Sequence, residues 1–216
     1  MTWQYTPFLT LTLIAAMLVG IAALYVVRQQ HAYEPVAGGH TAVVLAGVIC
    51  WVLLAYALQL GSVELQQKLF WYELSFVGFM PIPVLLLVFT LRYTDRDEWL
   101  TPRVFGGVAS VLLVGTLLGL TNSSHGLLWT GTHRVDAGSF LATQITRQPL
   151  FFLFVAVNYL VILAGMYVLA RLILGSQQVY RGQAAALVGS AAVPMLVNVT
   201  TVLELGPWPP VELSPV

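Results

Sequence analysis

Long apolar runs, separated by short polar segments, dominate the chain from end to end. A helix needs about 20 mostly apolar residues to cross a bilayer. Runs close to that length occupy approximately residues 7–27, 41–60, 69–91, 104–120, 149–170 and 183–203. This pattern predicts an all-α fold, a polytopic bundle of about six transmembrane helices.

The composition strengthens this interpretation. Hydrophobic residues make up 58% of the chain and charged residues only 8%, whereas a soluble domain carries about 25% charged residues. So few charges cannot cover a surface that faces water, so we expect a multi-pass protein of the plasma membrane with the lipid bilayer as its solvent. No Lys or Arg precedes Arg28, so the first run lacks the positive region of a signal peptide and is expected to remain as a helix.

The distribution of basic residues predicts the orientation of the bundle. Cytoplasmic loops of membrane proteins carry an excess of Lys and Arg. With the N-terminus outside, six arginines fall in inner loops, whereas only Lys68, Arg134 and Arg147 fall outside. The six are Arg28, Arg92, Arg96, Arg103, Arg171 and Arg181. We therefore expect the N-terminus outside, and six crossings would also place the C-terminus outside.

Two local signals modify the helical picture. In the long outer loop 121–148, the β-prone runs 129–135 and 140–146 flank an Asp/Gly turn, which predicts a short β-hairpin, with irregular loop as the alternative. Prolines interrupt two spans, at Pro81 and Pro83 and at Pro194, and each removes a helical hydrogen bond and favours a kink.

Several classes of function are excluded or disfavoured. The net charge is zero, so the basic face that binds nucleic acid is lacking. The single cysteine, Cys50, permits no intramolecular disulfide and no site built on paired cysteines. His125 and His133 do not have zinc-ligand spacing, and no phosphate-binding glycine loop occurs. We therefore assign no catalytic residue, metal or cofactor, and do not expect this chain alone to be an enzyme.

One ionisable group lies within a span. Such groups are rare and usually functional, and Glu73 sits about one turn inside the outer end of the third run. A ligand contact is one interpretation, and a carboxylate anchored among interfacial aromatics is the other. Polar residues at a similar depth favour interhelical hydrogen bonding or a shared pocket. The hypothetical pocket comprises Glu73, Trp71, Asn122, His125 and Asn198.

Three blocks of sequence carry a resemblance to a known family. They are LFWYELSFVGFMPIPVLLLVFTLRYTDRDEWLT at 69–101, TNSSHGLLWT at 121–130, and Pro-x-Leu-x-Asn from Pro194 to Asn198. With these blocks the chain resembles, from about residue 10 to its end, the N-terminal seven-helix sensor region of membrane histidine kinases. The resemblance implies a homodimer whose parent protein continues into cytoplasmic kinase-type output domains.

The chain departs from this family in showing six predicted spans rather than seven. We divide it into a transmembrane sensor bundle, residues 1–204, and a proline-rich outer tail, residues 205–216, that would lead into a missing seventh helix. We therefore expect the sensory input module of a two-component-type protein, which detects a small ligand or membrane signal on its outer half. A small-molecule transporter or permease is the alternative, and a membrane scaffold without a ligand is a third.

Overall fold

The computed structural model describes residues 3–32, 38–136, 140–175 and residue 189. The predicted sixth span, with Pro194 and Asn198, lies outside the described residues. The helices are α1 (Pro7–Ala32), α2 (Gly39–Gly61), α3 (Leu65–Phe79), α4 (Ile82–Tyr93), α5 (Pro102–Leu120), α6 (Asn122–His125) and α7 (Pro149–Gly175), with one 3-10 turn, η1 (Asp97–Trp99). The strands are β1 (Trp129–Asp136) and β2 (Leu141–Arg147).

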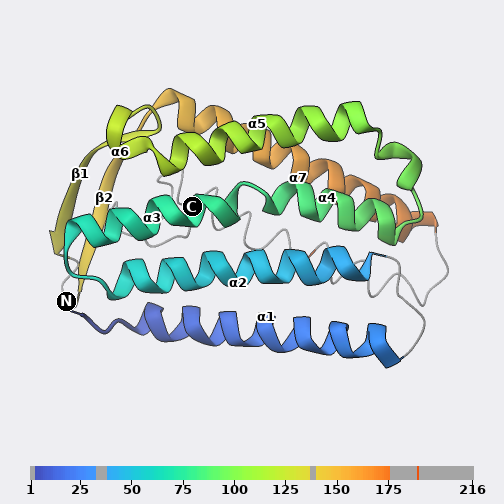
Figure 1. Cartoon of the computed structure of the whole chain (residues 1–216), viewed down its shortest axis with the longest axis horizontal. Coiled ribbons are helices and arrows are strands. Elements are labelled where there is room, and N and C mark those ends of the chain that lie inside the picture. The colour runs from blue at the N-terminus through green and yellow to red at the C-terminus, as the bar shows by residue number, and fades with distance from the viewer. Residues whose placement is uncertain (1–2, 33–37, 137–139, 176–188, 190–216) are drawn as a thin grey trace.

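The long helices form the predicted bundle. They lie alongside one another (Figure 1), with α1 against α2, α2 against α3 and α4, α5 against α3, and α7 against α4. In the described part, four segments are long and apolar enough to cross a membrane, and the apolar part of α5 is shorter. The four are Pro7–Gln30, Gly39–Gly61, Leu65–Tyr93 and Pro149–Arg171. The predicted fold class, a transmembrane helix bundle, is confirmed.

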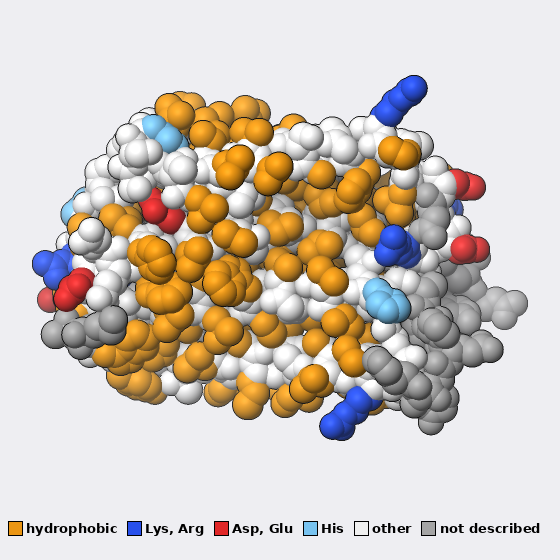
Figure 2. All heavy atoms as spheres, in the orientation of Figure 1, with side chains coloured by type: hydrophobic (Ala, Val, Ile, Leu, Met, Phe, Trp, Pro, Cys, Tyr) orange, Lys and Arg blue, Asp and Glu red, His pale blue; other side chains and the backbone are white. Residues whose placement is uncertain are grey.

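Lipid-facing surface explains why these helices need no polar stripe. On α1, Leu11, Met17 and Leu24 are 62%, 58% and 64% exposed. Figure 2 shows hydrophobic side chains along the flank of the bundle, whereas the charged side chains gather toward its two ends. In water such a surface would drive association, but a bilayer solvates it without a polar covering.

The third predicted span is interrupted where its prolines lie. The helix α3 ends at Phe79 and α4 begins at Ile82. Pro81 and Pro83 have no N–H group, so they cannot donate to the carbonyl groups four residues earlier. The span Leu65–Tyr93 therefore consists of two helical halves joined at a break, as the prolines predict.

Close contacts at small residues hold α5 against the broken span. A Cβ atom at Gly119 would overlap the ring of Phe76, which is fully buried. A Cβ atom at Gly115 would lie only 3.0 Å from the sulfur of Met80. Because glycine leaves these positions empty, α5 approaches α3 closely, as small residues allow in membrane helices.

The predicted hairpin is also present. The strands β1 and β2 pair antiparallel, from Trp129 opposite Arg147 to Asp136 opposite Leu141, with an irregularity between Thr130 and His133. The hairpin lies over the end of the bundle at which the N-terminus is found (Figure 1). We call the segment Asn122–Asp136 with Phe140–Arg147 the cap, and this end of the molecule the cap end.

Candidate functional site

Asn122 organises the loop that leads from the bundle into the cap. Its side chain is 2% exposed. Its Nδ2 donates to the carbonyl oxygen of Trp129 at 2.9 Å, and its Oδ1 accepts from the backbone N–H of Leu128 at 2.8 Å. A longer bond to Oδ1 comes from the N–H of Trp129 at 3.4 Å. The amide thus supplies hydrogen-bond partners to backbone groups of a buried turn, where no helix or strand pairing supplies them.

An aromatic cluster seats the cap on the bundle. The ring of Trp129, on β1, lies with its centroid 4.8 Å from that of Tyr72 and 5.2 Å from that of Phe76, both on α3. All three side chains are buried. Aromatic pairs at such distances are stabilising beyond the area they bury, so the base of the hairpin is fixed on α3.

Glu73 links the same helix to the cap by a charged contact. Its Oε1 accepts a hydrogen bond from the backbone N–H of Ser123, in α6, at 2.9 Å. A carboxylate that accepts from a backbone N–H forms a stronger bond than a neutral acceptor does. Glu73 is only half-buried, so solutes in the aqueous phase can compete for this contact.

His125 lies on the exposed side of the same short helix. Its Nδ1 accepts from the backbone N–H of Leu127 at 3.0 Å, so in the neutral ring Nε2 carries the proton and donates to the hydroxyl of Thr121 at 3.1 Å. Ser123, which contacts Glu73, lies two residues before His125. Glu73, Asn122 and His125 are therefore brought together at one corner of the cap end.

The other predicted site residues are placed differently. Trp71 stacks edge-on against Phe70, with ring centroids 5.1 Å apart. Residues two apart on a helix point to different sides, so Trp71 does not share the face of Glu73. Asn198 lies outside the described residues. Trp129, which joins the cap to α3, was missed as a site residue because an isolated tryptophan is read first as an interface anchor.

A second polar corner, where α2 ends, was also missed. The backbone N–H of Gln4 donates to the carbonyl oxygen of Gly61 at 2.8 Å. The side-chain Nε2 of Gln4 donates to the carbonyl oxygens of Leu60 and Leu141, each at 2.8 Å. Its Oε1 accepts from the N–H of Leu141 at 2.9 Å. One side chain therefore ties the N-terminus, α2 and the hairpin together. Gln4 precedes the first span and belongs to no pattern that could have indicated this.

Lys68 belongs to the same corner. It is 2% exposed, and its Nζ donates to the carbonyl oxygen of Gln59 at 3.0 Å. Nearby, Arg134 of the hairpin donates to the carbonyl oxygen of Val63 at 3.4 Å. The sequence placed Lys68 at the outer mouth of a helix, and its enclosure between helices follows only from the packing of α3 on α2.

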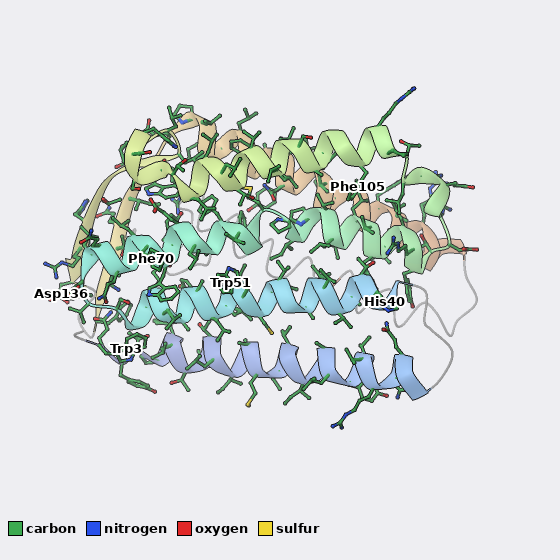
Figure 3. The ribbon with its side chains drawn as sticks, in the orientation of Figure 1. Trp3, His40, Trp51, Phe70, Phe105 and Asp136 are labelled. Atoms are coloured by element: carbon green, nitrogen blue, oxygen red, sulfur yellow. The ribbon has the colours of Figure 1, made fainter. Side chains whose placement is uncertain are left out.

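These groups belong to segments that meet at the cap end of the molecule. In Figure 3, Trp3, Phe70 and Asp136 lie toward the cap end, whereas His40 lies toward the other end. Among the described residues, no group of three or more His, Cys, Asp or Glu side chains could hold a metal ion. The cap end therefore combines charged, amide and aromatic groups, an arrangement suited to binding and conformational coupling.

The fold and this site define a polytopic helical membrane protein with a structured β-hairpin cap at one end. The chain matches the model of the family described as the N-terminal 7TM region of histidine kinase over residues 11–216, and it belongs to that family. The resemblance predicted from the sequence is thereby confirmed. No curated protein and no solved structure shows significant similarity to the chain.

Membership defines the general role. The family is the N-terminal sensor region of histidine kinases, a membrane sensory module. It implies a lipid bilayer as the surroundings and a cytoplasmic kinase output domain in the parent protein.

Proposed function

We propose that this sensor module detects a small ligand or a membrane signal at its cap end, which faces the outside of the plasma membrane. The observation that carries the proposal is the hydrogen bond between Glu73 and the backbone of Ser123. It connects a transmembrane helix directly to the cap through a half-buried charge. Such a charge at the edge of a membrane helix is rarely retained for packing alone.

The distribution of arginines supports the orientation. Arg28, Arg92, Arg96, Arg103 and Arg171 lie in or beside the ends of α1, α4, α5 and α7 that are farthest from the hairpin. This end would be cytoplasmic under the positive-inside rule.

The break in the third span offers a way to transmit the signal. A ligand that competes for Glu73 would free α3 from its contact with α6, while the hairpin stays seated on α3 through Trp129 and α4, beyond Met80 and Pro81, stays packed on α7. Two arrangements of α3 relative to α4 would then differ in ligand affinity, as a population shift requires. In this proposal His125 lies beside the contact between Glu73 and Ser123, and Asn122 holds the loop.

The test is Glu73→Gln in a full-length histidine kinase that carries this region. The amide keeps the size and an acceptor but loses the charge, which weakens the bond by about 1 kcal/mol. We expect basal autophosphorylation in membranes to change by roughly fivefold. The matched control is Glu64→Gln, an exposed glutamate at the same end. Equal output from both variants would rule out the role of Glu73.

The resemblance also leads us to propose that the parent kinase is a homodimer. The mass of the detergent-solubilised full-length protein, determined by light scattering, tests this directly. A monomeric mass in active preparations would contradict it.

A further inference from the structure

Lys68 is a cation enclosed within the bundle. It is the only lysine of the chain and is 2% exposed. Its ammonium group donates to the backbone carbonyl of Gln59 at 3.0 Å. A charge taken out of water carries a large desolvation penalty unless it is paired and fully hydrogen-bonded. The role of this ammonium group therefore depends on which hydrogen-bond and charge partners it has.

The described contacts satisfy it only in part. The carbonyl of Gln59 belongs to the last turn of α2, and the C-terminus of a helix carries a partial negative charge of about one half. An ammonium group has three donors, and the described contacts use one. Within the described residues, no carboxylate is paired with Lys68. Part of the positive charge and two donors remain available to an anion.

The position of Lys68 favours an amphiphilic anion. Lys68 lies in the first turn of α3, at the end of the bundle that carries the exposed rings of Trp3 and Phe70. Aromatic side chains of this kind mark the level of the lipid headgroups. The anionic head of an amphiphile lies at the same depth, with its apolar part in the hydrocarbon. One ammonium group matches one negative charge, whereas a phosphate monoester would bring an excess of charge into a poorly hydrated place.

The surrounding contacts indicate how such a head would enter. Gln4 reaches the carbonyl oxygen of Leu60 in the last turn of α2, and Arg134 reaches that of Val63 in the connection between α2 and α3. These bonds join the α2–α3 corner to the N-terminus and the hairpin. Parting them would loosen the corner that holds Lys68 without unpacking the core of α3, α5 and α7.

We propose that Lys68 binds the oxyanion of a singly charged amphiphile, either a free alkyl carboxylate or the headgroup of an anionic lipid. This proposal gives a ligand class to the cap end and so rests on the proposed function. Binding itself can be measured without any kinase output, so the two can fail separately.

The first test observes Lys68 directly. Because the chain has one lysine, isotope labelling at lysine Cε gives one side-chain resonance in the full chain, reconstituted in phosphatidylcholine nanodiscs. We expect sodium octanoate to shift this resonance in a saturable manner and octanol to leave it unchanged. Replacing part of the lipid with phosphatidylglycerol tests the second source, the headgroup of an anionic lipid.

The outcomes distinguish the two sources. A shift with octanoate alone identifies a carboxylate, a shift with the lipid alone identifies a headgroup, and shifts with both identify a shared site. No shift with either anion, or an equal shift with octanol, overturns the proposal.

The second test measures affinity. Lys68→Met keeps most of the length of the side chain but removes its charge, and Arg103→Gln removes an exposed cation from the opposite end. We expect the dissociation constant for whichever anion shifts the resonance to rise at least about tenfold in Lys68→Met and to stay within about twofold in Arg103→Gln. Equal affinities of wild-type protein and Lys68→Met overturn the proposal. If Lys68→Met fails to reconstitute, the lysine resonance of the wild-type chain still shows whether an anion binds at Lys68.

Binding without any effect on the output of a full-length kinase would retain the site and contradict its part in signalling.

Discussion

At the residue scale, Asn122 shows how one side chain can organise a whole loop. Its amide replaces the backbone partners that are lacking where α6 turns into β1, and it does so while buried. Glu73 contacts the neighbouring residue, Ser123, so its contact to the cap depends on the position that Asn122 gives to this turn.

Asn122→Ala should therefore destabilise the protein. The substitution leaves the carbonyl of Trp129 and the N–H of Leu128 without the amide in a buried turn, at a cost of about 1–3 kcal/mol. Thermal unfolding in detergent, followed by circular dichroism, measures the loss. Ser124→Ala removes an exposed hydroxyl next to the same turn and should change the stability by less than about 0.5 kcal/mol. Similar unfolding temperatures for the two variants would contradict this role of Asn122.

The sequence predicted some of these residues but not their contacts. Glu73, Asn122 and His125 could be selected because polar groups near the end of a span are unusual. The bonds of Asn122 to Leu128 and Trp129, and those of Gln4 to Leu60 and Leu141, join groups that only the folded chain brings together. No spacing rule in the sequence could have predicted them.

At the element scale, the strongest local signals in the sequence were sufficient to predict the break in the third span and the hairpin. The prolines at 81 and 83 predicted the break between α3 and α4, and the turn residues after Asp136 predicted the hairpin. Helix packing was harder to predict from the sequence, because it depends on which face of each apolar helix contacts a neighbour. The apolar residues of α5 surround the helix, so the side that holds Gly115 and Gly119 against α3 is evident only in the structure.

Gly119→Ala tests this packing. The added methyl group would overlap the buried ring of Phe76, and overpacking of a core costs typically about 1–3 kcal/mol. Gly107→Ala on the same helix is the control, since a Cβ atom there has no neighbour within 4 Å. Unfolding temperatures in detergent should fall only for Gly119→Ala. A comparable fall for both would mean that the change acts on the helix itself and not on its contact with α3.

At the scale of the whole molecule, the cap ties together helices that are distant in sequence. It is seated on α3 through Trp129 and held to α2 and the N-terminus through Gln4. These are separate attachments, so loosening one does not require unfolding of the bundle. The cap can therefore change its contact with one helix while it remains fixed to another.

Gln4→Ala should release the hairpin tip while leaving its base in place. The backbone N–H of Leu141 donates to the side chain of Gln4, so its hydrogen exchange should accelerate at least about tenfold, whereas the N–H of Leu128, held by Asn122, should keep its rate. Hydrogen–deuterium exchange with mass spectrometry measures both. Tyr5→Phe, at an exposed neighbouring position, is the control. Unchanged exchange at Leu141 in Gln4→Ala would show that Gln4 does not hold the tip.

The proposal that the cap end senses signals from outside requires the hairpin to face the exterior, and cysteine labelling tests this most directly. With Cys50 replaced by alanine, single cysteines are placed at Thr146, exposed on β2, and at Thr101, exposed at the opposite end between η1 and α5. A membrane-impermeant maleimide is then added to intact cells. We predict that Thr146→Cys reacts at once and that Thr101→Cys reacts only after the cells are permeabilised. The reverse pattern would place the cap in the cytoplasm and contradict outside sensing.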